Sequence, residues 1–177
     1  EYIADLQGNR LTFSYNDEGR LTRVENSAGK VLRYAYTSQQ KISKITLPNG
    51  QTLEYGYDES DNLITFTDTG GHTRAYIYDS EHNLVGYIDS NGRNIFQASY
   101  DDQERVATYT RGAATYTFGY DPGNQETTKT DSDNQTWTYH YNDDELITKI
   151  VYPDGASTSY TFDANNNPTQ VTDANGN

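Results

Sequence analysis

The chain has 177 residues, of which 26 are acidic and 13 are basic, so its formal net charge is −13. A surface this acidic repels phosphate backbones, so nucleic-acid binding is not expected. The sequence has no Cys, which excludes disulfides, thiolate nucleophiles and Cys-ligated zinc, and no apolar run approaches the roughly 18 residues of a membrane span. It also has no Met and opens with no signal peptide, so we expect a fragment of a larger protein.

The aromatic residues define an internal repeat. The second aromatic of each Tyr-x-Tyr-like pair recurs every 20 to 22 residues, at Tyr15, Tyr36, Tyr57, Tyr78, Tyr100, Tyr120, Tyr141 and Phe162. Seven of the eight residues two positions earlier are also aromatic, namely Phe13, Tyr34, Tyr55, Tyr76, Phe118, Tyr139 and Tyr160. We predict that these fifteen residues are the structural anchors of one array of eight repeats that spans residues 1–177.

The first repeat shows what each repeat is expected to form. Residues 11–15 alternate apolar and polar, which is the two-residue period of a half-buried β-strand. Residues 16–19 are typical of a turn, and a second strand is expected to start near Leu21 and to pass Val24. Because the apolar positions of this second strand lie three apart, we expect either a β-bulge or a short strand there.

The later repeats follow the same order along the chain, and several end in turns that favour positive φ, as in Asn49-Gly50, Asn91-Gly92 and Asp154-Gly155. The intervals before the fifth and sixth anchors are 22 and 20 residues, and the sixth repeat has Glu126 and Lys129 where other repeats have aliphatic residues. We therefore expect an irregular or bulged sheet there. With no sustained helical spacing, the predicted fold is all-β, in which tandem hairpins with about 16 strands form a long antiparallel sheet that curls or spirals.

The repeated pattern resembles the YD repeat of Rhs proteins. The best matches are Tyr55-Gly56-Tyr57-Asp58 and Tyr76-Ile77-Tyr78-Asp79, and residues 13–21 resemble the longer form of the motif with its Gly-Arg-Leu turn. The family includes bacterial Rhs and wall-associated proteins, insecticidal toxin-complex subunits and teneurins. The resemblance covers essentially the whole chain and implies a segment of a β-sheet that spirals into a hollow shell, which in bacterial members typically encloses a C-terminal toxin.

This resemblance implies a non-enzymatic structural segment of a secreted or cell-surface polymorphic toxin. Its expected partners are further repeats and an enclosed C-terminal toxin domain of the same polypeptide. No cofactor is expected, and free sheet edges are expected to associate edge to edge. The alternative is a cell-surface module that binds carbohydrate or protein through its aromatic residues, as choline- and glucan-binding repeats do. Those repeats have several Trp, whereas this chain has one, which favours the shell.

The residues that could carry chemistry do not form a recognisable site. The only histidines, His72, His82 and His140, lack ligand spacing and are expected on the surface, with His140 opposite the aromatic side chains and His82 in a turn. Residues 131–134 and 173–176 resemble calcium loops faintly, but they lack the twelve-residue spacing and the closing Glu, so hairpin turns are expected.

Two further features can be interpreted in two ways, either as a functional feature or as part of the repeat structure. The Rhs core usually ends in an Asp-Pro-x-Gly-Leu motif that is tied to autoproteolytic release of the toxin. The nearest stretch is Asp121-Pro122-Gly123-Asn124-Gln125, which lacks the Gly-Leu and is expected to be a turn. Trp137 takes the place of Leu or Phe four residues before the anchor, so core packing is expected, with sugar stacking or partner contact as the alternative.

Overall fold

The computed structural model describes residues 1–177, and every regular element in it is a β-strand. All of the described strand pairs are antiparallel, which confirms the all-β prediction. No helix is present that is long and apolar enough to cross a membrane. The chain divides into two compact segments, residues 1–94 and 95–177.

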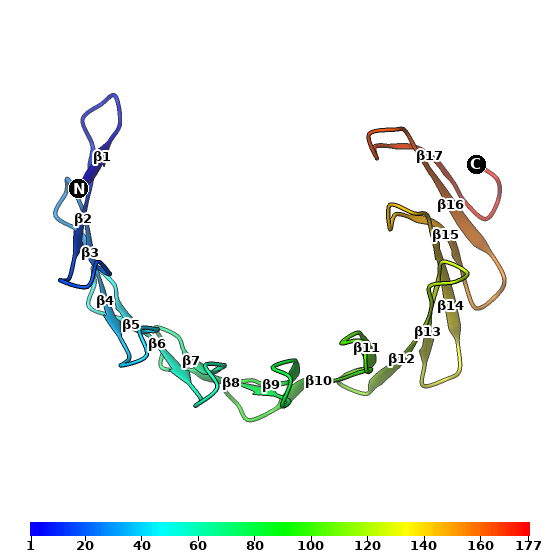
Figure 1. Cartoon of the computed structure of the whole chain (residues 1–177), viewed down its shortest axis with the longest axis horizontal. Helices are drawn as coiled ribbons and strands as arrows, with labels where there is room; N and C mark the ends of the chain where they lie inside the picture. The colour runs from blue at the N-terminus through cyan, green and yellow to red at the C-terminus, as the bar shows by residue number, and fades with distance from the viewer. The chain divides into compact units, whose positions relative to one another are not determined.

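The N-terminal segment is a ladder of nine strands in which each strand pairs with the next one along the chain (Figure 1). The strands are β1 (Tyr2–Ala4), β2 (Arg10–Tyr15), β3 (Leu21–Asn26), β4 (Val31–Tyr36), β5 (Ile42–Thr46), β6 (Thr52–Tyr57), β7 (Leu63–Thr67), β8 (Thr73–Tyr78) and β9 (Leu84–Ile88).

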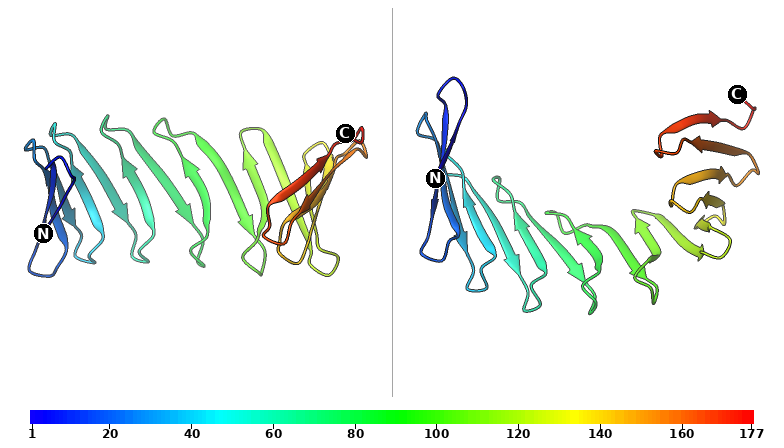
Figure 2. Two further views of the ribbon diagram at one scale, coloured as in Figure 1. Left: turned by 90° about the horizontal axis from the view of Figure 1, so that it is seen from above. Right: turned by 45° about the horizontal axis from the view of Figure 1, so that its top comes forward.

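The C-terminal segment repeats this arrangement with eight strands, again paired in chain order (Figure 2). The strands are β10 (Asn94–Tyr100), β11 (Val106–Arg111), β12 (Ala114–Asp121), β13 (Glu126–Asp131), β14 (Thr136–Tyr141), β15 (Ile147–Val151), β16 (Ser157–Phe162) and β17 (Pro168–Thr172). All fifteen predicted anchors lie on the first strand of a hairpin, on β2, β4, β6, β8, β10, β12, β14 and β16.

A β-bulge follows the first turn of seven of the eight hairpins. In the first hairpin Ser14 pairs with Arg23 but Tyr15 pairs with Leu21, so Thr22 is the extra residue. The same shift occurs in the hairpins of β4–β5, β6–β7, β8–β9, β10–β11, β14–β15 and β16–β17. The bulge explains why the apolar residues of the second strand are three apart, because the extra residue keeps both on one face.

The sixth hairpin, β12–β13, is the one without this bulge. It pairs continuously from Tyr116↔Asp131 to Asp121↔Glu126, whereas the fifth hairpin has the same bulge as the others. The predicted irregularity of the sixth repeat was therefore wrong. Since side chains alternate faces with a period of two, loss of the bulge puts Thr127 opposite Tyr120 and moves Glu126 to the other face.

The second turn of the fifth repeat is shorter than those of the other repeats. Ala114 stands fourteen residues after the anchor Tyr100, where most repeats have Gly. In the structure Arg111 pairs with Ala114, and a two-residue loop of Gly112 and Ala113 joins β11 to β12. Gly112 has a φ of 61°, so it supplies the left-handed conformation that such a tight loop requires.

The chain has no enclosed core, since no hydrophobic side chain in it is fully buried. Most strand side chains are half-buried, and Gly86 is the one buried residue. This pattern is what a single sheet layer gives, because each side chain packs against its neighbours along one face and remains open to solvent above them. Tyr suits such a face, since its ring packs while its hydroxyl reaches a partner or water.

Candidate functional site

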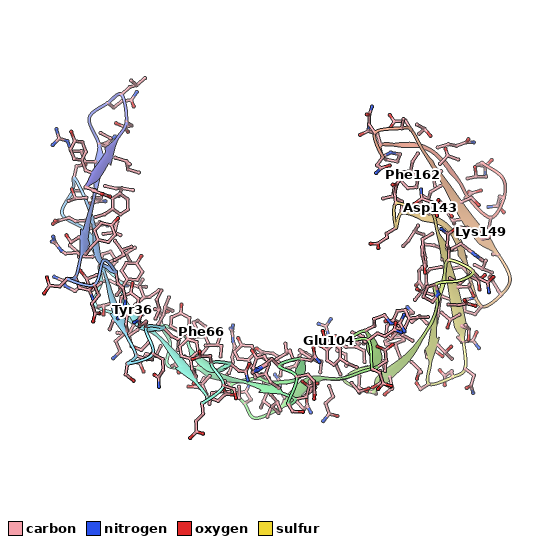
Figure 3. All side chains as sticks on the ribbon, viewed as in Figure 1. Tyr36, Phe66, Glu104, Asp143, Lys149 and Phe162 are labelled. Atoms are coloured by element: carbon pink, nitrogen blue, oxygen red, sulfur yellow. The ribbon has the colours of Figure 1, made fainter.

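One face of each segment carries nearly all of the large apolar side chains. Phe13 pairs with Val24 and Val24 pairs with Leu32, so these three side chains project from the same side. We call this side the aromatic face; it carries the fifteen anchors and the residues paired with them. In Figure 3, Tyr36 and Phe66 lie on this face of the N-terminal segment, whereas in the C-terminal segment Lys149 lies on the face opposite Phe162.

Rings from neighbouring strands contact one another on the aromatic face. The ring centroids of Tyr55 and Phe66 are 5.3 Å apart, and those of Tyr76 and Tyr87 are 5.5 Å apart. In the C-terminal segment the rings of Phe96 and Tyr109 stack at 5.8 Å. Each contact joins strands that are neighbours in the ladder, so the rings form a row along the face rather than a pocket.

Several anchor hydroxyls bond to the preceding hairpin. The hydroxyl of Tyr36 donates to the carbonyl oxygen of Leu21 at 2.7 Å, and the hydroxyl of Tyr57 donates to that of Ile42 at 3.0 Å. Tyr120 donates to Val106 in the same way, at 2.8 Å. In each case the acceptor is the first residue of the bulged strand, which lies outside the ladder to the next strand.

This bond gives the anchor tyrosine a role beyond packing. In these hairpins the bulge and the early end of the ladder leave a carbonyl without a strand partner, and Tyr36, Tyr57 or Tyr120 of the next repeat supplies a hydroxyl for it. Tyr141 follows the hairpin that has no bulge, and its hydroxyl makes no such bond; there the backbone N–H of Tyr141 donates to the carbonyl of Gln125 at 3.0 Å. Burial raises the pKa of the Tyr120 hydroxyl, so it remains a protonated donor at neutral pH.

The residue after the anchor forms the first turn. Asn16 Oδ1 accepts the backbone N–H groups of Glu18 at 3.1 Å and Arg20 at 2.9 Å. The second turn uses the same geometry, since Asn26 Oδ1 accepts from Ala28 and Lys30. Both bonds recur in twelve turns, which begin at Asp5, Asn16, Asn26, Asp58, Asp68, Asp79, Asp89, Asp101, Asp131, Asn142, Asp163 and Asp173.

These bonds favour the ionised form of the turn aspartates. A side-chain hydrogen bond from Asn62 is the largest influence that lowers the pKa of Asp58, and one from Arg105 is the largest for Asp101. The pKa of Asp68 is also lowered, and the largest influence there is the hydrogen bond from the backbone N–H of His72. The repeated Asp of the Tyr-Asp pattern is thus an Asx-turn residue, held as an anion by the donors it orders.

No cluster in the chain could hold a metal ion, since nowhere do three His, Cys, Asp or Glu residues gather with suitable geometry. Residues 131–134 form the hairpin turn between β13 and β14, as predicted, and residues 173–176 form a turn of the same kind after the last strand. In the first, Asp131 Oδ1 already accepts the N–H groups of Asp133 and Gln135. The stretch that begins at Asp121 is also a turn, in which the N–H of Asn124 donates to the Asp121 carbonyl at 3.2 Å.

The three histidines lie apart from one another. His72 and His82 are in turns, where they lie 3.2 Å from Asp68 and 2.9 Å from the side chain of Asn62, respectively. His140 is on β14 with its side chain opposite the aromatic face, as predicted, and its Nδ1 is 3.1 Å from Glu126 Oε1. This contact exists because the sixth hairpin lacks the bulge, so Glu126 lies on the polar face opposite His140.

The face opposite the aromatic face is polar. Lys44 and Glu54 pair across β5 and β6 at 2.7 Å, and paired threonines bond through their hydroxyls. These threonine pairs include Thr67–Thr73 and Thr130–Thr136. Such cross-strand pairs stabilise a solvated face but offer no nucleophile activated by a base.

The sequence model of the teneurin YD-shell family matches residues 3–74 and 65–176, which is almost the whole chain. No curated protein matches the sequence.

Solved structures of toxin complexes share the fold. The TcdB2-TccC3 crystal structure aligns with a TM-score of 0.70 at 17% identity, over 93% of this chain and 11% of that chain. TcdB2-TccC3 without its hypervariable C-terminal region gives 0.67 at 16% identity, over 91% and 10%. The Photorhabdus luminescens Tc holotoxin pore gives 0.57 at 11% identity, over 97% and 12%. The chain therefore spans about a tenth of the length of these chains, and the likeness establishes the fold alone.

Proposed function

Because the chain belongs to the teneurin YD-shell family, we propose that it is a non-enzymatic structural segment of the wall of a YD-repeat shell, and that the shell encloses a C-terminal toxin or effector domain of the same polypeptide. Its partners are then the repeats that continue the sheet and the enclosed domain. As part of an exported effector, the polypeptide acts outside the producing cell or at its surface.

The observation that carries this proposal is how the side chains that recur in the repeats are used. The turn aspartates bond to their own backbone, the anchor hydroxyls bond to the previous hairpin, and the rings pack along one face. The recurring turn carboxylates thus stabilise each turn, while the hydroxyl bonds and ring contacts join neighbouring strands. Stability shared between neighbouring repeats in this way is typical of a wall that lengthens by adding units.

Protection of the cargo tests the proposal. The complete polypeptide that contains this chain is expressed with a C-terminal epitope tag and treated with proteinase K, beside the C-terminal domain expressed alone. We expect the tagged domain to survive at protease concentrations at least about tenfold higher within the complete polypeptide, since protein-enclosed chain is inaccessible to protease.

A matched pair of variants links the protection to this segment. Tyr55→Ala removes a ring from the row on the aromatic face, whereas Thr46→Ala changes a neighbouring strand away from it. Protection should fall in Tyr55→Ala and persist in Thr46→Ala. Equal digestion of the tagged domain with and without the repeats would refute enclosure, and saturable binding of the chain to a cell-surface polysaccharide would support the carbohydrate-binding alternative.

A further inference from the structure

A cation lies on the aromatic face of the C-terminal segment. Lys129, on β13, pairs with Phe118 on one side and with Trp137 on the other, so its side chain projects among the rings. Its Nζ lies 4.9 Å from the ring centroid of Tyr116 and 4.3 Å from that of Trp137. These distances are those of cation–π contacts, which hold the ammonium between a phenol and the single indole of the chain.

The chain carries twice as many acidic as basic residues, yet none of them places a carboxylate within 4 Å of this ammonium. Lys129 forms no ion pair within 4 Å, in contrast to Lys44 on the polar face, which pairs with Glu54. The carboxylate nearest in register is Asp131, two residues along the same strand, and its Oδ1 is committed to the turn that follows. Lys129 is half-buried, so part of its hydration is lost without replacement by an anion.

We propose that Lys129, Tyr116 and Trp137 form a recognition site for a peptide carboxylate, presented by an extended segment whose apolar side chains pack on the aromatic face beside it. The site goes beyond the wall function, because it requires only the C-terminal segment and does not depend on what the shell encloses. The occupant is identified by charge complementarity, since an ammonium among rings lacks only an anionic acceptor.

The chemistry of the site supports an acidic peptide rather than a neutral one. The rings contact the ammonium through their π faces, which attract the charge without accepting a conventional hydrogen bond, so its N–H donors remain available. A carboxylate that accepts from them forms a charge-assisted hydrogen bond, which is roughly twice as strong as a neutral one. Apolar side chains on either side of the carboxylate then cover the rings of Phe118 and Trp137, which are half-exposed.

Binding of two matched peptides tests the site. The probe is acetyl-Leu-Ser-Glu-Ser-Leu-amide, which presents Leu, Glu and Leu on one face when extended, and the control peptide has Gln in place of Glu. Each is titrated into the full chain while the indole N–H signal of Trp137 is followed by two-dimensional NMR. We expect saturable binding of the Glu peptide and roughly tenfold weaker binding of the Gln peptide, in keeping with the loss of one charge-assisted hydrogen bond.

Variants distinguish binding of the peptide at Lys129 from nonspecific binding to the aromatic face. Lys129→Met keeps an apolar stem and should weaken the Glu peptide to the level of the Gln peptide, whereas Lys129→Arg should retain most of the binding. Lys149→Met is the control, because that lysine lies on the polar face of β15. Thermal unfolding of each variant establishes that it is folded. Equal binding of both peptides, binding unaffected by Lys129→Met, or shifts produced by glucuronate and by neither peptide would each overturn the proposal.

Discussion

Removal of the Tyr36 hydroxyl tests how the repeats are coupled. Tyr36→Phe keeps the ring but deletes the donor that reaches the Leu21 carbonyl at 2.7 Å. A net hydrogen bond contributes about 1 kcal/mol to the free energy of unfolding. The bond is only partly buried, so water can replace part of it, and the loss should lie at or below that figure.

For a chain of this length, about 1 kcal/mol corresponds to a fall of roughly 2–4 °C in the midpoint of thermal unfolding. Tyr57→Phe should have a similar effect, because its hydroxyl bonds to Ile42 in the same geometry. Tyr141→Phe is the matched control: its hydroxyl makes no equivalent bond, so the midpoint should move by less than about 1 °C. Circular dichroism during heating measures all three.

Hydrogen exchange locates the effect. If the hydroxyl joins one hairpin to the next, amides at the start of β3 should exchange faster in Tyr36→Phe, while those of the C-terminal segment should be unchanged. The reasoning fails if Tyr141→Phe destabilises the chain as much as Tyr36→Phe does, since the hydroxyl would then contribute independently of the bulged carbonyl.

Three further predictions concern the turns. Asp58→Ala should lower the urea midpoint of unfolding more than Asp58→Asn, because Asn retains the acceptor for the two backbone N–H groups. Since the folded-state pKa of Asp58 is lowered below that of the unfolded chain, its stabilisation is complete above about pH 4 and is lost as the pH falls through the folded pKa; the melting midpoint of Asp58→Asn should therefore drop less on acidification than that of the wild type, and equal drops would contradict this. Gly29→Ala should cost about 1 kcal/mol in a urea titration because φ is +76°, whereas Gly29→Asn should cost less, since the site is sterically open and only the backbone conformation is strained.

The hairpin pattern could be predicted because it depends on local signals. The two-residue period placed the strand of residues 11–15, and the second strand begins at Leu21 as expected. The turns could be predicted because each of them needs a residue with positive φ. In the second turns Gly usually fills that place, whereas in most first turns non-glycine residues such as Gln40, Asp61 and His82 adopt it, which the sequence did not reveal.

Which face of the sheet each side chain of the sixth repeat occupies could not be predicted from the sequence. The count of residues from Tyr120 to Glu126 matches that of the other repeats, but the Pro-Gly turn absorbs one more residue and the bulge disappears. The change is local: Glu126 moves to the polar face and Thr127 takes its place opposite Tyr120, while Lys129 stays on the aromatic face opposite Phe118. The cation site at Lys129 was not predicted. Lys129 was interpreted only as a substitution for an aliphatic residue, whereas its ammonium lies over rings on neighbouring strands.

The central claim is that this chain is a stretch of wall around an enclosed domain. Cryo-electron microscopy of the complete polypeptide that contains it tests the claim most directly. The account predicts that residues 1–177 form consecutive hairpins of a closed β-sheet shell, with density for a C-terminal domain inside it. An open sheet without enclosed density, or a C-terminal domain outside the repeats, would contradict the account.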